Sequence, residues 1–188
     1  MEAIPARAIF VVTVTGSEST GKTTLARELA RCFDEPCVPE FVRAYLDEKT
    51  AVSGLPLDAS DVEPIARGQI AAQDEGMAKA RRVVVLDTDL VSTVVYARHY
   101  YGSCPAWIEQ EARERRADLY LLCDIDVPWV PDPQRDRAHM RPYMHALFVE
   151  ALEALGARYV TIRGSWDERR AAAIDAVSSF SRSPSGGR

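Results

Sequence analysis

The nine residues "GSESTGKTT" at positions 16–24 decide the fold that we expect. They satisfy the pattern GxxxxGK followed by Ser or Thr, which marks a phosphate-binding loop when a strand precedes it and a helix follows. The apolar run "AIFVVTV" (8–14) precedes the stretch, and the helical pattern "GKTTLARELARCF" (21–33) begins inside it. Glycines let such a loop wrap around phosphate oxygens, and the positive end of the helix dipole points at them. The stretch therefore predicts a phosphate cradle rather than an ordinary strand-to-helix turn.

The side chains of the cradle have distinct expected roles. Lys22 is predicted to reach the β- and γ-phosphates of a bound nucleotide, and the Thr23 hydroxyl to ligate Mg²⁺. The loop backbone and its short side chains are expected to supply the other contacts to ATP, from Gly16, Ser19, Thr20, Gly21 and Thr24. We therefore predict ATP and Mg²⁺ as cofactors.

Further apolar runs alternate with helical patterns along the chain. The runs at 82–87 and 119–125 are continuously apolar, which is typical of strands covered on both faces in a parallel sheet. Shorter runs lie at 37–39, which pattern alone does not assign, and at 158–162. The alternation predicts a three-layer α/β domain with a P-loop NTPase fold. We expect five parallel strands in the order 2-3-1-4-5, with helices on both faces.

Capping signals mark several of the expected helices. Ser-x-x-Glu boxes at 60–63 and 165–168 open two of them. Gly102 is expected to close a third as a left-handed cap, and a fourth is expected to end at Gly156. Residues 50–60 are predicted to be a surface loop. Leu25, Leu29 and Cys32 are expected to share the apolar face of the first helix.

The chain length of 188 residues suits a single domain with one sizeable core. We expect an N-terminal arm (1–7), a P-loop kinase domain (8–180) and a polar, disordered tail (181–188). The segment 126–141 is predicted to be a lid, because its prolines break a helix interior and its arginines suit a phosphate.

Composition argues against several classes of protein. The net charge of −5 disfavours a nonspecific nucleic-acid coat, and no apolar run approaches the roughly 20 residues that span a bilayer. The start of the chain lacks the order of a signal peptide, because Glu2 precedes any cation. The cysteines lack paired spacing and are expected to be buried thiols. We therefore expect a cytoplasmic protein without nucleic-acid or membrane partners, and the oligomeric state stays open.

Carboxylates follow two of the predicted strands on the side of the cradle. Asp87 ends the third run, where open parallel sheets bind ligands, and is expected to hold the magnesium ion. A helix N-cap is the alternative role for Asp87, although Asp89 fits that role better. Glu40 follows the second run and is expected to take the proton of an attacking hydroxyl. A solvent-facing pair of Glu40 with Arg43 at a helix start is the alternative.

Two groups of residues are expected around the acceptor. Arg43 and Asp89 are candidates for binding substrate hydroxyls, and Trp129 for stacking on a planar ring, with a core-anchoring role as its alternative. In the lid, Arg135 is expected to stabilise the transferred phosphoryl group and Arg137 to bind ATP. For each lid arginine, a surface salt bridge is the alternative role.

A small-molecule kinase is the class of P-loop protein that fits best. A GTPase switch needs DxxG and NKxD, but "TDL" follows Asp87 and no NKxD-like tetrad occurs. A ring-forming ATPase usually has an acidic pair directly after this strand and a separate helical lid domain, for which the chain is too short. An ATP-dependent regulator without a small-molecule acceptor stays open as a second class.

Several motifs, taken in order, resemble one family. They are "GSESTGKTTLARELA", "PEFVRAYL", "GQ" at 68–69, "VVVLDTDLVST", "VPWVPDPQR" and "YVTIRGSWDERR". They are similar to motifs of the ribosylnicotinamide kinase domain of bacterial NAD-biosynthesis regulator proteins, which are P-loop kinases of the AAA-type ATPase superfamily. The similar segments extend from about Ile9 to Ala173, nearly the whole chain.

The resemblance implies a substrate. In that family the domain phosphorylates the 5′-hydroxyl of nicotinamide riboside with ATP and gives nicotinamide mononucleotide, so we expect this activity here. Fuller members carry an adenylyltransferase domain, and sometimes a DNA-binding domain, ahead of the kinase. Since the first strand begins at residue 8, we expect neither in this sequence. From the residues alone, another nucleoside or a nucleotide stays open as the acceptor.

Overall fold

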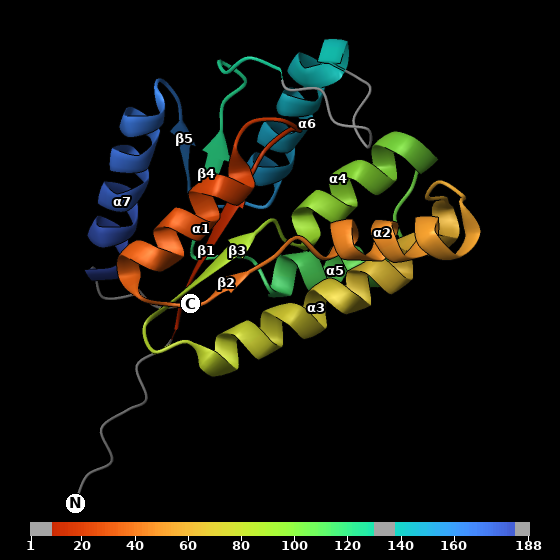
Figure 1. Cartoon of the computed structure of the whole chain (residues 1–188), viewed down its shortest axis with the longest axis horizontal. Coiled ribbons are helices and arrows are strands. Elements are labelled where there is room, and N and C mark those ends of the chain that lie inside the picture. Colours follow the sequence, from red (N-terminus) through yellow and green to blue (C-terminus); the bar gives the residue numbers. More distant parts are fainter. Residues whose placement is uncertain (1–8, 130–137, 183–188) are drawn as a thin grey trace, which may run out of the picture.

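Five parallel strands form one sheet in the order β2-β3-β1-β4-β5 (Figure 1). The computed structural model describes residues 9–129 and 138–182. Each strand overlaps the apolar run that predicted it, so the predicted order 2-3-1-4-5 is confirmed. The strands are β1 (Phe10–Thr15), β2 (Cys37–Val38), β3 (Val83–Asp87), β4 (Leu119–Cys123) and β5 (Tyr159–Ile162).

The central position of β1 places the phosphate loop over the middle of the sheet. β1 pairs with β3 on one side and with β4 on the other. Val14 is the register partner of Asp87. Because the carboxyl ends of parallel strands meet at one edge, Asp87 lies beside the strand that leads into the loop.

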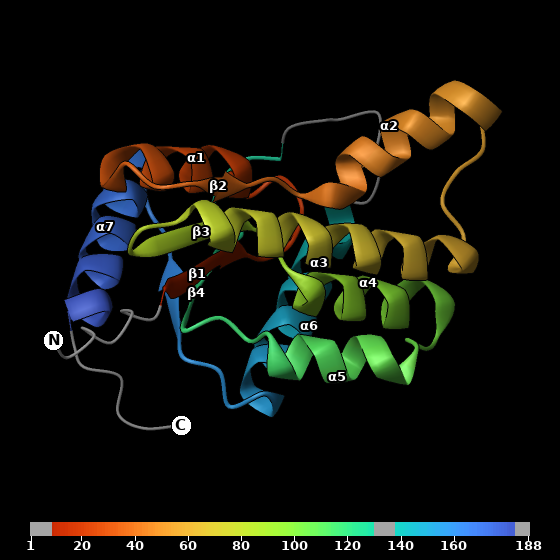
Figure 2. The ribbon, with the colours of Figure 1, turned by 90° about the horizontal axis from the view of Figure 1, so that it is seen from below.

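Helices cover both faces of the sheet, as Figures 1 and 2 show. One face carries α1 (Lys22–Phe33) and α7 (Trp166–Arg182). The other face carries α3 (Val62–Lys79), α4 (Leu90–Tyr101) and α6 (Arg141–Ala154), and α5 (Ala106–Glu114) packs against α3 and α4. The remaining helices are α2 (Phe41–Ser53) and two short 3-10 helices, η1 (Ala59–Asp61) and η2 (Ala138–Met140). The predicted three-layer α/β architecture is confirmed.

The hydrophobic core lies on both sides of the sheet, because successive strand residues point to opposite faces. Val12 and Val14 pack with α1 and α7, whereas Val11 packs with α4 and α6. β3 and β4 are buried along their whole length, which explains why their sequences are continuously apolar. Phe148 of α6 is fully buried, and truncating such a side chain to alanine typically costs about 3–5 kcal/mol.

Three of the predicted helix boundaries are confirmed. Gly102 (φ +78°) and Gly156 (φ +56°) follow α4 and α6 in the left-handed conformation. At the start of α7, the Glu168 carboxylate accepts a hydrogen bond from the Ser165 backbone N–H at 2.8 Å. The Ser165 hydroxyl in turn accepts from the Glu168 N–H at 3.4 Å, which completes the predicted capping box.

The segment 50–60 is partly helical, so the prediction of a surface loop is wrong for part of it. α2 continues to Ser53, and η1 begins at Ala59. No side chain of α2 is buried. The helix therefore lacks the apolar stripe that reveals a helix in a sequence. In Figure 2, α2 leans away from α3 toward its C-terminal end.

The predicted capping box at 60–63 is also wrong. Asp58 caps η1 instead, accepting a hydrogen bond from the Ser60 N–H, and the Asp61 carboxylate accepts from the Asp58 N–H at 2.7 Å. The helix thus begins with a turn of 3-10 helix two residues earlier than expected.

Other predictions differ in detail at the chain's thiols and ends. Cys32 is exposed, because the buried stripe of α1 runs through Ala26 and Ala30 beside Leu25 and Leu29. Cys123 is buried as expected. α7 continues to Arg182, into the predicted tail. The arm (1–7), residues 183–188 and residues 130–137 of the lid lie outside the described residues.

Helix α5 was not predicted from the sequence. It packs through Ile108 and Ala112 against Val62, Ala66, Leu90 and Ala97. None of the helices in the described part of the chain combines the length and the apolar character needed to cross a membrane.

Candidate nucleotide and acceptor site

The phosphate loop between β1 and α1 contains three residues with positive φ. They are Gly16 (φ +128°), Ser19 (φ +53°) and Gly21 (φ +83°). A Cβ atom on Gly16 would lie 2.8 Å from the Cys123 carbonyl oxygen, which is closer than Cβ atoms approach. Only glycine fits at this position. The loop is therefore held tightly against the end of β4.

Lys22 keeps its charge close to the loop. Its Nζ donates a hydrogen bond to the Ser17 carbonyl oxygen at 2.8 Å, and the Thr20 hydroxyl donates to the same oxygen at 2.9 Å. Lys22 is buried, and the first turn of α1 contains no acidic residue. The ammonium group and the positive end of the helix dipole therefore act together. This arrangement favours an anion such as a phosphate.

Thr23 and Asp87 form the candidate metal site. The Thr23 hydroxyl donates a hydrogen bond to the Asp87 carboxylate. Burial raises the pKa of Asp87, although the bond from Thr23 and the charge of Lys22 act in the opposite direction. The Oδ1 atom of Asp87 is buried without a hydrogen-bond partner among the described residues, which is costly unless a cation or water completes its coordination. Hard oxygen ligands of this kind fit Mg²⁺.

Asp89 lies in the interior rather than at the loop surface. Its carboxylate accepts hydrogen bonds from the Val91 N–H at 3.0 Å, the Tyr120 hydroxyl at 2.8 Å and the Thr13 hydroxyl at 3.4 Å. Burial raises the pKa of Asp89 to about 6. The N-cap role expected for Asp89 is confirmed. Its carboxylate is enclosed by these partners, so the structure does not bring Asp89 to the acceptor side.

Glu40 and Arg43 form an ion pair at the start of α2. Arg43 Nε lies 3.3 Å from Glu40 Oε2, and both side chains are partly exposed. The charge of Glu40 raises the pKa of Asp87, and the charge of Arg43 lowers it. The pair is therefore close enough to the candidate metal site for its charges to act there. The ion pair is the contact expected if Glu40 and Arg43 only pair at the start of the helix. The position of Glu40 also suits the alternative role of taking a proton from an acceptor hydroxyl.

The start of α2 is held in place by α3. The Phe41 N–H, one of the unpaired donors in the first turn, donates to Gln69 Oε1 at 3.0 Å. A Cβ atom on Gly68 would lie 2.1 Å from the Phe41 ring, so the glycine makes room for it. In the sequence, the pair "GQ" (Gly68 and Gln69) was notable only as one of the motifs that resemble the family. In the structure, the pair fixes the backbone next to Glu40.

An acceptor hollow lies between the phosphate loop, α4 and α6. It is lined by Ser17, Glu18, Tyr96, Tyr100, Trp129, Met140, Arg141 and Met144. The Tyr96 and Tyr100 rings stack with centroids 6.0 Å apart. The cavity volume is about 10 Å³, room for a single water at most, so a ring enters only if a lining side chain moves. Tyr100 is the lining aromatic residue that is exposed.

Two arginines hold the phosphate loop from behind. Arg169 is 1% exposed and donates to the carbonyl oxygens of Gly164 (2.9 Å), Asp124 (3.2 Å) and Thr20 (3.3 Å), and also to the Asp126 carboxylate. Arg141 donates to the carbonyl oxygens of Val127 (2.9 Å) and Ser19 (3.4 Å). The loop carbonyls are thereby tied to α6, α7 and the segment after β4.

The structure brings together many of the residues predicted for the site, but not all. The cradle residues, Asp87, Glu40 and Arg43 lie at one edge of the sheet, and Trp129 lines the hollow with the Arg141 guanidinium 5.7 Å from its ring. Arg135 and Arg137 fall outside the described residues.

Sequence reasoning missed Glu18, Tyr96, Tyr100 and Arg169. A signal was present for the tyrosines, which lie four residues apart on the helix that follows Asp87. No local pattern distinguishes Arg169 from the other arginines of α7.

A phosphate loop on the central strand of this sheet, with a carboxylate at the end of the neighbouring strand, defines a P-loop nucleotide-binding domain. The solved structures that match place its fold among the P-loop kinases. The chain belongs to the family described as an AAA domain, whose sequence profile matches residues 11–169.

Two curated relatives are similar along most of the chain. The "Trifunctional NAD biosynthesis/regulator protein NadR" of Escherichia coli (strain K12) is 30% identical over 156 residues, which are 82% of this chain and 38% of the relative. The protein of the same name from Salmonella typhimurium (strain LT2) is 29% identical over 157 residues, again 82% and 38%. The chain thus spans less than half the length of these relatives.

Solved structures agree with this assignment. A "NadR protein in complex with NR" has a TM-score of 0.79 and 28% identity, with 94% of this chain and 52% of that chain covered. A "NadR protein in complex with NAD and AMP-PNP" has a TM-score of 0.72 and 28% identity, covering 96% and 52%. A thymidylate kinase from Ehrlichia chaffeensis has a TM-score of 0.66 at 13% identity, covering 90% and 99%, which shows the shared fold alone.

Proposed function

We propose that this chain is an ATP-dependent kinase that phosphorylates the 5′-hydroxyl of nicotinamide riboside and releases nicotinamide mononucleotide and ADP. The observation that carries the proposal is the acceptor hollow beside the phosphate loop, which is lined by aromatic rings and by Glu18. A pyridinium cation is attracted to aromatic faces and to carboxylates. The similarity to a NadR structure in complex with NR supports the same substrate.

The loop and α1 are assigned to the nucleotide. Lys22 would exchange its bond to the Ser17 carbonyl oxygen for the β- and γ-phosphates of ATP, and the backbone of the loop would surround them. Thr23 and Asp87 would hold Mg²⁺, which neutralises charge on these phosphates. The match to a NadR structure with the ATP analogue AMP-PNP supports ATP as the donor.

Glu40 is assigned to the acceptor hydroxyl. In the transfer step the 5′-oxygen forms a bond to the γ-phosphorus, the bond from that phosphorus to the bridging oxygen of ADP breaks, and Glu40 takes the hydroxyl proton. Arg43 lies 3.3 Å from Glu40 and restrains it, and Gln69 fixes the backbone that carries it. Positioning of the hydroxyl within roughly 3–3.5 Å of the phosphorus supplies much of the rate.

The remaining predicted residues are assigned to closure over the substrates. Trp129 would stack on the nicotinamide ring and Arg43 would approach the ribose. Arg135 and Arg137 are proposed to close over the transferred phosphate, stabilising its charge and excluding water, since hydrolysis of ATP is the competing reaction. We further propose that residues 8–180 form one kinase domain, which acts in the cytoplasm on these small molecules.

Measurement of ADP release across a panel of acceptors tests the proposal. The purified protein would be given ATP, Mg²⁺ and one of nicotinamide riboside, uridine, thymidine or thymidine monophosphate. We expect nicotinamide riboside to give the highest kcat/KM. Lys22→Ala should lower transfer by several orders of magnitude with the fold intact, because Lys22 acts on charge that develops in the transition state.

Glu40→Gln separates the two classes of function that remain open. In a kinase it should abolish transfer and leave ATP binding nearly unchanged. Preference for another nucleoside would overturn the substrate but not the kinase. Binding of ATP without phosphorylation of any acceptor would instead favour the ATP-dependent regulator.

A further inference from the structure

The first turn of α2 is capped by a side chain from another helix. Glu40 occupies the N-cap position of α2, but its side chain makes no capping hydrogen bond. An N-cap side chain ordinarily accepts a hydrogen bond from one of the backbone N–H groups in the first turn. Here the Phe41 N–H donates instead to Gln69 Oε1 at 3.0 Å, in the middle of α3. Gln69 therefore supplies a cap that Glu40 does not.

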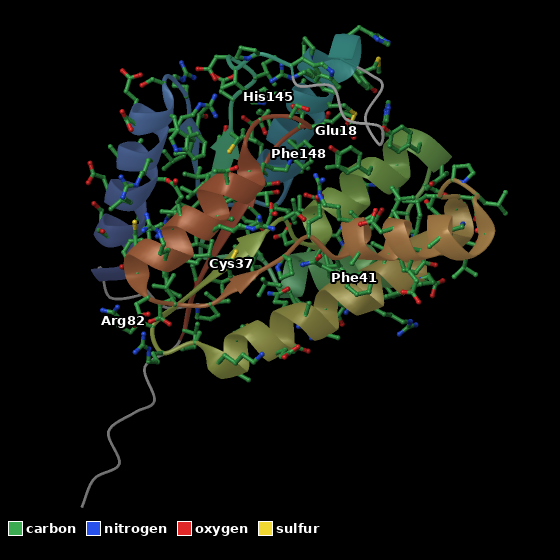
Figure 3. All side chains as sticks on the ribbon, in the orientation of Figure 1. Glu18, Cys37, Phe41, Arg82, His145 and Phe148 are labelled. Carbon is green, nitrogen blue, oxygen red and sulfur yellow. The ribbon has the colours of Figure 1, made fainter. Side chains whose placement is uncertain are left out.

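Two adjacent residues of α3 build this contact. A Cβ atom on Gly68 would lie 2.1 Å from the Phe41 ring, so the missing side chain lets the two helices approach each other. Figure 3 shows Phe41 where α2 begins beside α3. A glycine inside a helix costs stability relative to alanine. The close approach that brings Gln69 to the start of α2 is therefore kept against a cost.

The amide of Gln69 is poorly satisfied for a buried group. The side chain is 3% exposed, and its oxygen must face the Phe41 N–H because only the oxygen accepts. Its Nε2 atom is left buried without a hydrogen-bond partner among residues 9–129 and 138–182. An apolar side chain of similar size would avoid the cost of that unpaired donor. The amide is thus better explained by a need for its oxygen at Phe41 than by stability.

The Glu40 carboxylate acts on two parts of the site. Burial raises the pKa of Asp87, and the charge of Glu40 raises it further. The pKa of Tyr96 is raised first by burial and then by the charges of Glu18 and Glu40. Glu40 therefore lies close enough to act at both the candidate metal site and the acceptor hollow. A carboxylate that accepted backbone N–H bonds as a cap would be a weaker base.

We propose that Gln69 is a positioning residue for the transfer reaction, which caps α2 in place of Glu40 and so keeps the Glu40 carboxylate directed at the acceptor hydroxyl. The inference rests on the proposed function and adds the residue that holds its base in place. Gln69 acts through the Phe41 N–H, which belongs to the peptide group that joins Glu40 to α2.

Gln69→Met tests this role, because methionine has a similar size and no oxygen that accepts from Phe41. We expect kcat with nicotinamide riboside to fall about 10- to 100-fold, since a small displacement of a catalytic group is enough for such a loss. ATP binding, measured by calorimetry, should be nearly unchanged, because Gln69 is not part of the phosphate loop. The loss should therefore appear in kcat and not in the KM for ATP.

Gln69→Glu is the conservative variant that should restore the activity. In either protonation state a carboxyl oxygen can accept from the Phe41 N–H, and a carboxylate at a helix N-terminus is favoured by the helix dipole. We expect its kcat to lie within about threefold of the unaltered protein, because the cap is kept.

Gln73→Met is the matched control. Gln73 lies one turn further along α3, is 2% exposed, and its Oε1 atom has no hydrogen-bond partner in the described part of the chain. The variant makes the same replacement at equal burial without removing an accepted hydrogen bond. It should leave kcat unchanged, and its Tm shows how much of any loss comes from repacking α3.

The outcomes separate the inference from the proposed function. An unchanged kcat in Gln69→Met would overturn the positioning role. Equal losses of kcat in Gln69→Met and Gln73→Met would overturn it as well, and so would a folded Gln69→Glu protein as slow as Gln69→Met. Failure of the unaltered protein to phosphorylate nicotinamide riboside is a different result, which removes the proposed function itself.

Discussion

Replacing Arg169 with methionine should destabilise the domain. The guanidinium is 1% exposed and donates to three backbone carbonyl oxygens and to Asp126. Methionine fills similar space but removes the donors to these acceptors, although Asp126 keeps the hydrogen bond from the Gly164 N–H at 2.6 Å. Removing one partner of a buried ion pair costs about 3–5 kcal/mol. The Asp126 side chain is 37% exposed, so water compensates part of its charge. We therefore expect Arg169→Met to lower the free energy of unfolding by about 3 kcal/mol, the lower end of that range.

Thermal unfolding measures this loss. For a domain of this size, 1 kcal/mol shifts Tm by roughly 2–4 °C, so Arg169→Met should lower Tm by about 6–12 °C. Arg170→Met is the matched control on the next residue, because Arg170 is 43% exposed and its Nε lies 3.5 Å from Glu28. A surface pair of this kind contributes less than about 1 kcal/mol. Equal Tm values for the two variants would refute the bracing role of Arg169.

Three further predictions concern the interior, the start of α2 and the product. Since burial raises the pKa of Asp89 from 3.8 to about 6, its contribution to stability is full below pH 4 and is lost as the pH rises toward 6. In urea unfolding, the free energy of unfolding of Asp89→Asn relative to the unaltered protein should therefore rise by on the order of 3 kcal/mol between pH 4 and 7. A difference between the two proteins that does not change with pH would contradict this. Gly68→Ala should lower kcat about tenfold at unchanged ATP affinity, because its Cβ would lie 2.1 Å from the Phe41 ring and displace Glu40. An unchanged kcat would argue against that coupling. Nicotinamide mononucleotide should inhibit with a Ki about tenfold above the KM for nicotinamide riboside, since Glu18 and Glu40 repel its phosphate; a lower Ki would contradict the repulsion.

The sheet and the cradle were predictable because their signals are local. The loop motif requires its glycines at Gly16 and Gly21, and continuous apolar runs mark β3 and β4, which are buried on both faces. The order of the strands then follows from the handedness of parallel crossovers. α2 gave no such signal, because it buries no side chain and is held through Phe41 and the Tyr45–Asp61 hydrogen bond.

The acceptor side was less predictable because its residues meet only in the folded chain. Tyr96 and Tyr100 read as ordinary helix aromatics, and Glu18 as a variable position of the phosphate loop. Asp87 and Asp89 are separated by one residue, and the sequence does not show which of the two carboxylates faces the phosphate loop. The structure separates them through Thr88, which has φ +69° and turns the chain between β3 and α4. A threonine in this conformation is strained by roughly 1–3 kcal/mol, and the buried bonds of Asp89 help to hold it.

Charge is divided across the phosphate loop in a way that the overall composition hides. The chain carries a net charge of −5, yet the nucleotide side has Lys22, the helix N-terminus and no acid in the first turn of α1. The acceptor side has Glu18 and Glu40, whose charges both act on Tyr96. The electrostatic potential in the site is set by the nearest charges, because dissolved salt screens the exposed charges that lie more than about 8–10 Å away. We therefore propose that the site presents a positive half to an anionic donor and a negative half to its acceptor. Ser17 lies between the two halves, because its carbonyl oxygen accepts a hydrogen bond from Lys22 and the residue also lines the hollow.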